Sequence, residues 1–247
     1  MSRKFAFAAV ASAFSLASLM SAPSASAGII ISNVQVPYYE SITLHSTATS
    51  PINASSTLSL FTAVGHSEAI GIAGQIILTT NIGMLGVWCV DLFRNISLGG
   101  SYNYDTGALA DNGSKPPVAP TSLSAQQIND IGKVAAYGNF LMSTAPTNAK
   151  SAAVQAAIWN IEYGTTATGS DPQFAVELTN IMNVLPTLTN PGGTELLSQK
   201  DNQGLYTSQG LYKPNTVPEP STLALIGLAM LAMFGLGLRR KQAAACA

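Results

Sequence analysis

Two short segments of this chain carry the side chains best suited to covalent chemistry. The first, residues 87–92, places Cys89 on a predicted strand, and the second, residues 154–160, places Gln155 inside a predicted helix. An ionised cysteine is a strong nucleophile. Alanines at 152, 153, 156 and 157 make the helix around Gln155 slim, so another backbone can approach it closely. We therefore take these segments as the candidate site.

A cysteine enzyme would need a histidine base beside Cys89. The chain has two histidines, His45 and His66, both in a region of predicted strands with polar neighbours. A solvated or structurally satisfied strand residue is the better interpretation of each. No His, Cys, Asp and Glu cluster has the spacing of metal ligands. We therefore expect no catalytic base, no metal site and no cofactor.

The elements that must position the two segments are predicted to be strands, then helices, then strands. Alternating or β-branched runs separated by polar clusters predict strands at 29–36, 41–46, 58–64, 70–79 and 84–93. A polar loop rich in glycine and proline is expected at 97–122. A closing strand pair is expected at 194–198 and 205–212, around the turn at 201–204.

Three helices are predicted between these strands. Ser124 and Gln127 form a capping box for the first. The second begins at Thr147 or Asn148 and runs through Tyr163 to Gly164, and the third covers 173–185 after Pro172. The order predicts an α+β fold, a mostly antiparallel β body with an inserted helical subdomain.

The C-terminal segment predicts a membrane anchor. An apolar run, 223–238, follows a Pro-Glu-Pro turn and precedes a basic stop. A membrane-spanning helix needs about 20 apolar residues, with a lower limit of about 17. Ser221 and Thr222 can extend this run towards that length. Positive residues stay cytoplasmic, so the C-terminus is expected inside and the bulk of the chain outside. The alternative, a buried core helix, would need an amphipathic face that the run lacks.

This segment resembles the PEP-CTERM sorting signal of Gram-negative bacteria. The motif residues are Val217, Pro218, Glu219 and Pro220, and the basic stop residues are Arg239, Arg240 and Lys241. The resemblance implies recognition by an exosortase, cleavage near the motif, and delivery to the cell surface or the exopolysaccharide matrix. The partners that it implies are the exosortase, the secretion machinery and, transiently, the membrane.

The N-terminus predicts export as well. Arg3 and Lys4 precede an apolar stretch, 5–20, and Ala25-Ser26-Ala27 is a small-x-small cleavage site. The expected organisation is a signal peptide at 1–27, an exported domain at 28–212, a linker at 213–220 and a sorting anchor at 221–247. The N-terminal signal and the C-terminal anchor are both expected to be helical.

Charge and cysteine content narrow the function further. Only 9% of the residues are charged, the net charge is −1 and no basic patch exists, which argues against nucleic-acid binding. Of the two cysteines, Cys246 lies beyond the basic stop and is expected in the cytoplasm. Cys89 would then be the only cysteine of the exported domain, where it cannot form an internal disulfide.

The two candidate segments resemble those of bacterial thioester domains, also called TQXA domains, of surface adhesins. Trp88-Cys89-Val90-Asp91 is similar to the cysteine strand of that family, and Gln155-Ala156-Ala157-Ile158-Trp159 to its glutamine helix. The resemblance covers about residues 80–190. It departs from the family pattern at Val154, which stands where a threonine is usual.

The resemblance implies that Cys89 and Gln155 form an internal thioester. Such a bond would be kept from water until an amine of a surface or matrix protein attacks it, and Trp88, Trp159 and Tyr163 are candidate shielding residues. The product would be a single-use covalent tether, so the chain would act as an adhesin or cross-linker and not as an enzyme. The alternative is a passive exopolysaccharide-associated protein in which Cys89 is a small buried hydrophobe.

Overall fold

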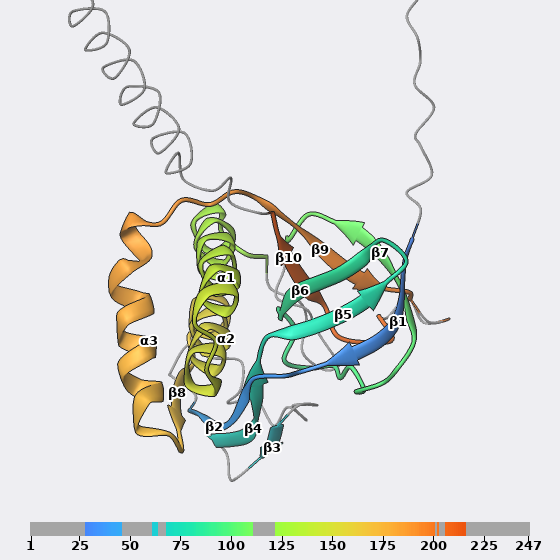
Figure 1. Cartoon of the computed structure of the whole chain (residues 1–247). Helices are drawn as coiled ribbons and strands as arrows, with labels where there is room; N and C mark the ends of the chain where they lie inside the picture. Colours follow the sequence, from blue (N-terminus) through green and yellow to red (C-terminus); the bar gives the residue numbers. More distant parts are fainter. Residues whose placement is uncertain are drawn as a thin grey trace, which may run out of the picture.

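A six-stranded closed barrel forms the larger part of the β structure (Figure 1). The computed structural model describes residues 28–45, 61–63, 68–110, 122–200, 202 and 206–215. The barrel strands are β1 (Ile29–Gln35), β5 (Ile76–Thr80), β6 (Gly83–Cys89), β7 (Tyr102–Gly107), β9 (Gly193–Ser198) and β10 (Leu211–Pro214). Their order is β1-β5-β6-β10-β9-β7, and all neighbours pair antiparallel.

A second, four-stranded antiparallel sheet has the order β3-β4-β2-β8. Its strands are β2 (Tyr39–His45), β3 (Phe61–Ala63), β4 (Glu68–Gly74) and β8 (Thr166–Gly169). The chain passes from this sheet into the barrel at Gln75, between β4 and β5. Ser151 fixes that junction because its hydroxyl accepts a hydrogen bond from the Gln75 N–H at 2.8 Å.

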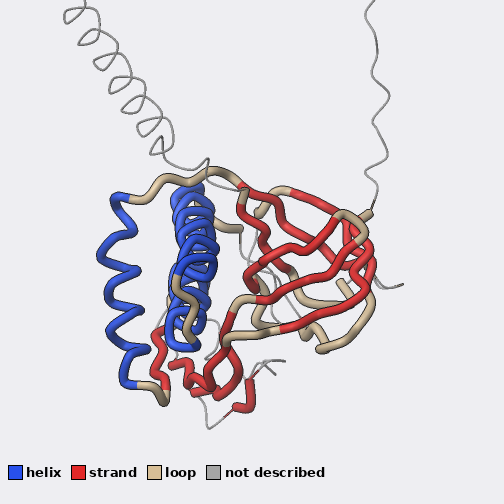
Figure 2. Tube along the Cα trace, viewed as in Figure 1, coloured by secondary structure: helices blue, strands red, loops and turns tan. Residues whose placement is uncertain are grey.

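Three helices gather on one side of the barrel (Figure 2). They are α1 (Ala125–Thr144), α2 (Asn148–Tyr163) and α3 (Pro172–Val184), the last continued by a 3-10 turn at Leu185–Thr187. Each begins at a side-chain cap, supplied by Ser124, Thr147 and Asp171 in turn. The capping box between Ser124 and Gln127 is present, and α2 ends at Gly164, whose φ of 65° suits glycine.

Helix α2 is the central element of the fold. It contacts α1, α3, β2 and β4, and most of its residues are buried. This explains its composition, because a helix enclosed on several sides cannot carry one polar face. The small side chains of Ala152, Ala153, Ala156 and Ala157, all buried, let neighbouring elements approach it closely.

The expected α+β class, with helices inserted into an antiparallel β body, is confirmed. Several bounds differ from expectation. The single strand expected at 70–79 is two strands that belong to different sheets, β4 and β5. The strand expected at 84–93 ends at Cys89.

The loop expected at 97–122 contains a barrel strand, β7, which is a correction. Its polar composition favours a loop, but Tyr104 is buried and β7 pairs with both β1 and β9. Strand β8 was also not expected from the sequence. Strand β10 reaches Pro214, two residues into the segment expected to be a linker.

The expected signal peptide at 1–27 and the expected anchor at 221–247 lie outside the described residues, as do the sorting-motif and basic-stop residues. Among the residues that the structure describes, no helix has the length and apolar character needed to cross a membrane.

Candidate functional site

Cys89 lies at the point where one side of strand β6 loses its neighbour. Strand β5 pairs with β6 only as far as Val87, opposite Ile76. On the other side β10 continues to Leu211, opposite Cys89. The backbone N–H and C=O of Cys89 therefore need partners that strand β5 does not supply.

The side chain of Gln155 supplies these partners. Its Oε1 accepts a hydrogen bond from the Cys89 N–H at 2.9 Å, and its Nε2 donates to the Cys89 carbonyl at 2.8 Å. The carboxamide thus makes the two bonds that a neighbouring strand would make. Cys89 is 2% exposed and Gln155 is 1% exposed. The residues that the sequence singled out therefore meet, brought together by β6 and α2.

The Cys89 thiol lies in a buried polar environment. It donates a hydrogen bond to the Asp91 carbonyl at 3.1 Å, and it accepts one from Gln209 Nε2 at 2.5 Å. Burial raises the pKa of the thiol well above its usual value, and the hydrogen bond to the Asp91 backbone only partly opposes this. The sulfur is therefore protonated at neutral pH.

Two of the three candidate shielding residues lie beside the thiol. Trp159 is near enough to Cys89 to lower the thiol pKa, which partly opposes the effect of burial. The Tyr163 hydroxyl donates to the Val90 carbonyl at 3.4 Å and accepts from the Leu92 N–H at 3.3 Å, and its ring meets Phe93 edge to face. Both aromatic residues come from α2, one helical turn apart.

Trp88 occupies the opposite side of β6, because successive side chains of a strand point to opposite faces. Its indole N–H donates to Ala135 O at 3.1 Å and to Asn139 Oδ1 at 2.9 Å, both on α1. Its ring also packs against Gly138. Trp88 therefore anchors β6 to α1 and does not cover the thiol, which corrects the expectation that it is a shielding residue.

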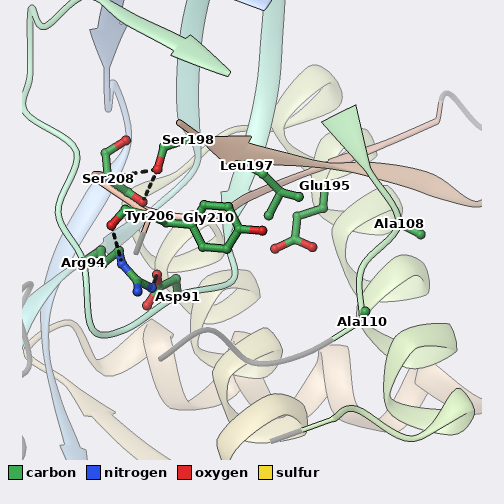
Figure 3. A pocket seen from close by; sticks show the side chains of 10 residues that line it. All are labelled: Asp91, Arg94, Ala108, Ala110, Glu195, Leu197, Ser198, Tyr206, Ser208 and Gly210. Atoms are coloured by element: carbon green, nitrogen blue, oxygen red, sulfur yellow. Dashed lines mark hydrogen bonds and ion pairs between the residues drawn. The ribbon is translucent and has the colours of Figure 1, made fainter. Parts of the chain in front are cut away.

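A buried ion pair lies just beyond the thiol. Arg94 Nη1 is 2.9 Å from Asp91 Oδ2, and Arg94 Nε donates to the Tyr206 carbonyl at 2.8 Å. Burial raises the pKa of Asp91, and the Arg94 guanidinium opposes that shift. The pair lines a pocket of about 100 Å³, which also includes Glu195, Ser208 and Gly210 (Figure 3).

The histidine that the structure describes is not at the site. His45 Nε2 hydrogen-bonds Thr168 Oγ1 at 3.0 Å within the four-stranded sheet. His66 lies outside the described residues. Among the described residues, no group of three His, Cys, Asp or Glu side chains could hold a metal ion.

Sequence reasoning missed Gln209 and the Asp91–Arg94 pair. Asp91 and Arg94 follow Cys89 closely, and their spacing could have suggested a local ion pair. Gln209 is 120 residues from Cys89 and has no local signal, because only the closure of the barrel brings it to the sulfur.

Comparisons with known proteins add two findings. Residues 216–241 match the PEP-CTERM protein-sorting motif, which confirms the sorting signal and indicates an exported surface protein processed by an exosortase. Among solved structures, the chain also shows similarity to the N-terminal thioester domain of a surface protein from Clostridium perfringens. That similarity has 14% sequence identity and a TM-score of 0.34, and covers 72% of this chain and 99% of the other. No curated protein matches the chain.

Proposed function

We propose that the exported domain forms an internal thioester between Cys89 and Gln155 and uses it once to bond an amine of a partner. The observation that supports this most directly is the pair of hydrogen bonds, 2.9 and 2.8 Å long, that hold the Gln155 carboxamide on the backbone of Cys89. Fixed proximity of this kind provides effective molarities of about 10⁵ M or more.

Bond formation balances within the two side chains. The Cys89 sulfur attacks the carbonyl carbon of Gln155, and negative charge develops on Oε1. The Cys89 N–H already donates to that oxygen, so it stabilises this charge. The C–N bond then breaks and the nitrogen leaves as ammonia, carrying the proton that the thiol loses. The step consumes no co-reactant.

The bond would persist because water is kept from it. Cys89 and Gln155 are almost fully buried, with Trp159 and Tyr163 also buried beside them. A thioester lacks the strong resonance of an amide and so stays reactive towards amines. Attack by a lysine amine of a surface or matrix protein would produce an amide at Gln155 and restore the Cys89 thiol.

A second function is favoured by the same contacts. Gln155 satisfies two backbone groups of Cys89 that β5 leaves without a strand partner, so it has a structural reason to be buried there. In that case the domain is a passive component of the exopolysaccharide matrix with a free, buried thiol. The two functions differ in covalent structure and can be separated by mass.

The first experiment is the intact mass of the exported wild-type domain. The thioester predicts a mass lower than the sequence mass by one ammonia, and Cys89→Ala should restore the full sequence mass of the variant. A full wild-type mass with a thiol that is alkylated after denaturation would overturn the thioester and favour the passive protein.

The second experiment uses methylamine as the probe. We expect one methylamine adduct per chain, located on Gln155 by peptide sequencing and absent from Cys89→Ala. Gln75→Met is the matched control, because Gln75 is another buried glutamine, and its side chain donates to Asn139 Oδ1 on α1. That variant should still be labelled on Gln155, and labelling elsewhere would contradict the assignment.

A further inference from the structure

Gln209 is a buried side chain that the thioester chemistry described so far does not use. It is 1% exposed and lies just before β10. Its Nε2 donates to the Cys89 sulfur at 2.5 Å and to the Asp91 carbonyl at 2.9 Å. The amide therefore bridges the sulfur and the backbone that follows it.

The backbone around Gln209 is fixed on both sides. Its N–H donates to Asn95 O at 3.3 Å, and its carbonyl accepts from the Tyr104 hydroxyl at 2.8 Å. The neighbours Ser208 and Gly210 line the pocket of Figure 3, whereas the Gln209 side chain reaches the sulfur. These backbone hydrogen bonds fix the position from which the Gln209 side chain extends to Cys89. The contact between Nε2 and the sulfur therefore does not depend on the side-chain rotamer alone.

Opening of the thioester by an amine requires a hydrogen-bond donor at the sulfur. When an amine attacks the thioester carbonyl, the C–S bond breaks and its electron pair moves to sulfur. Burial makes a charged sulfur unfavourable here, as the raised pKa of the thiol indicates. The Asp91 carbonyl, which accepts from the thiol, cannot stabilise a charged sulfur.

We propose that Gln209 is a catalytic residue of thioester aminolysis, donating a hydrogen bond to the sulfur as it leaves. This inference rests on the proposed function. The attacking amine forms the new C–N bond at Gln155, the C–S bond breaks, and the amine's surplus proton passes to the sulfur, which ends as a thiol. Throughout, Gln209 Nε2 holds the sulfur without exchanging atoms with it.

The test compares the wild-type domain with Gln209→Met, which keeps the length of the side chain and removes the donor. The measurements are the rates at which methylamine and water open the bond in the fraction of chains that carry it. Hydrogen bonds to charged groups contribute about 1.5–3 kcal/mol, so both rates should fall about tenfold or more. Gln75→Met, which removes a buried amide elsewhere, should change neither rate.

The direction of the hydrolysis rate separates this role from simple shielding. If Gln209 only excluded water or held the fold, Gln209→Met would speed hydrolysis, and that result would overturn the proposal. Gln209→Glu provides a second variant of equal size, in case the methionine variant unfolds. Its carboxyl can donate only while it is protonated, so the ratio of its hydrolysis rate to that of the wild type should fall as pH rises through the titration of that carboxyl.

Failure of this proposal and failure of the proposed function give different results. A wild-type domain with its full sequence mass has no thioester, which overturns both. A wild-type domain that is lighter by one ammonia, together with a Gln209→Met variant that reacts at wild-type rates, keeps the thioester and overturns the role of Gln209 alone.

Discussion

At the scale of residues, the site around Cys89 is defined by the hydrogen bonds between its buried polar atoms. Gln155 satisfies the backbone of Cys89, and Gln209 and the Asp91 carbonyl contact the sulfur. Every one of these groups is buried, so each is held by protein partners and not by water. The same burial that would protect a thioester also keeps a free thiol protonated.

The raised thiol pKa predicts how stability depends on pH when the bond is absent. In Gln155→Met, which cannot form the thioester, the unfolded thiol ionises from about pH 8.5, while the folded thiol keeps its proton. The unfolded state then binds fewer protons, so the free energy of unfolding should fall as pH rises, by at most about 1.4 kcal/mol per pH unit.

Urea unfolding between about pH 8 and 9 measures this effect below the ordinary pKa of tyrosine, which is about 10. The control is Gln155→Met combined with Cys89→Ala, in which the decline over this range should be smaller. Equal slopes in the two variants would contradict the assignment of the pH dependence to Cys89.

At the scale of elements, the site depends on close packing of α1, α2 and β6. Gly138 of α1 is the contact point, because a Cβ there would lie 2.5 Å from Val154 Cγ1 and 2.6 Å from Trp88 Cζ2. Those residues precede Gln155 and Cys89 directly. The absence of a side chain at Gly138 therefore sets how near the two candidate reacting residues come.

Gly138→Ala should push α2 and β6 apart. Overpacking of this kind costs about 1–3 kcal/mol, which outweighs the gain of about 1 kcal/mol from better helix propensity. We expect a lower free energy of unfolding and a smaller fraction of chains lighter by one ammonia, measured by urea unfolding and intact mass.

Gly132→Ala is the matched control on the same helix. A Cβ there would meet the Asn190 side chain, whose Oδ1 accepts from the Gly192 N–H, so this variant overpacks α1 at a different point. The fraction of its chains that are lighter by one ammonia should stay as in the wild type. If both alanine variants behaved alike, close packing at Gly138 would not be what positions the site.

At the scale of the whole molecule, the chain combines the folded domain with the PEP-CTERM protein-sorting motif that residues 216–241 match. The described domain ends at Asn215, directly before that match. A partner-bonding domain needs delivery to a surface or matrix where amines of other proteins are present. The proposed chemistry and the sorting signal are therefore compatible, although neither requires the other.

The sorting signal predicts the fate of the exported chain. Replacing Pro218 and Glu219 together by alanine should leave the chain in the membrane fraction with its C-terminal peptides still attached. Glu177→Ala on α3 is the control and should be processed as wild type. Cell fractionation and peptide mass spectrometry measure both, and normal release of the double variant would contradict the role of the motif.

By itself, the sequence determined the features that depend only on residues close together in the chain, such as helix ends and short motifs. The helix caps at Ser124 and Thr147, the stop at Gly164 and the sorting motif are all local patterns, and the structure or the family match confirms them. The α+β order was predictable for the same reason, since hydrophobic period and capping act over a few residues.

Only the tertiary structure decided which distant groups meet. Strand β7 forms in a polar segment because β1 and β9 pair with it, and Trp88 bonds Ala135 and Asn139 because α1 packs on that face of β6. The contact between Cys89 and Gln155 was suggested by a resemblance, but it depends on α2 packing where β5 has ended. Gln209 reaches the sulfur only through barrel closure, a long-range arrangement that no local pattern records.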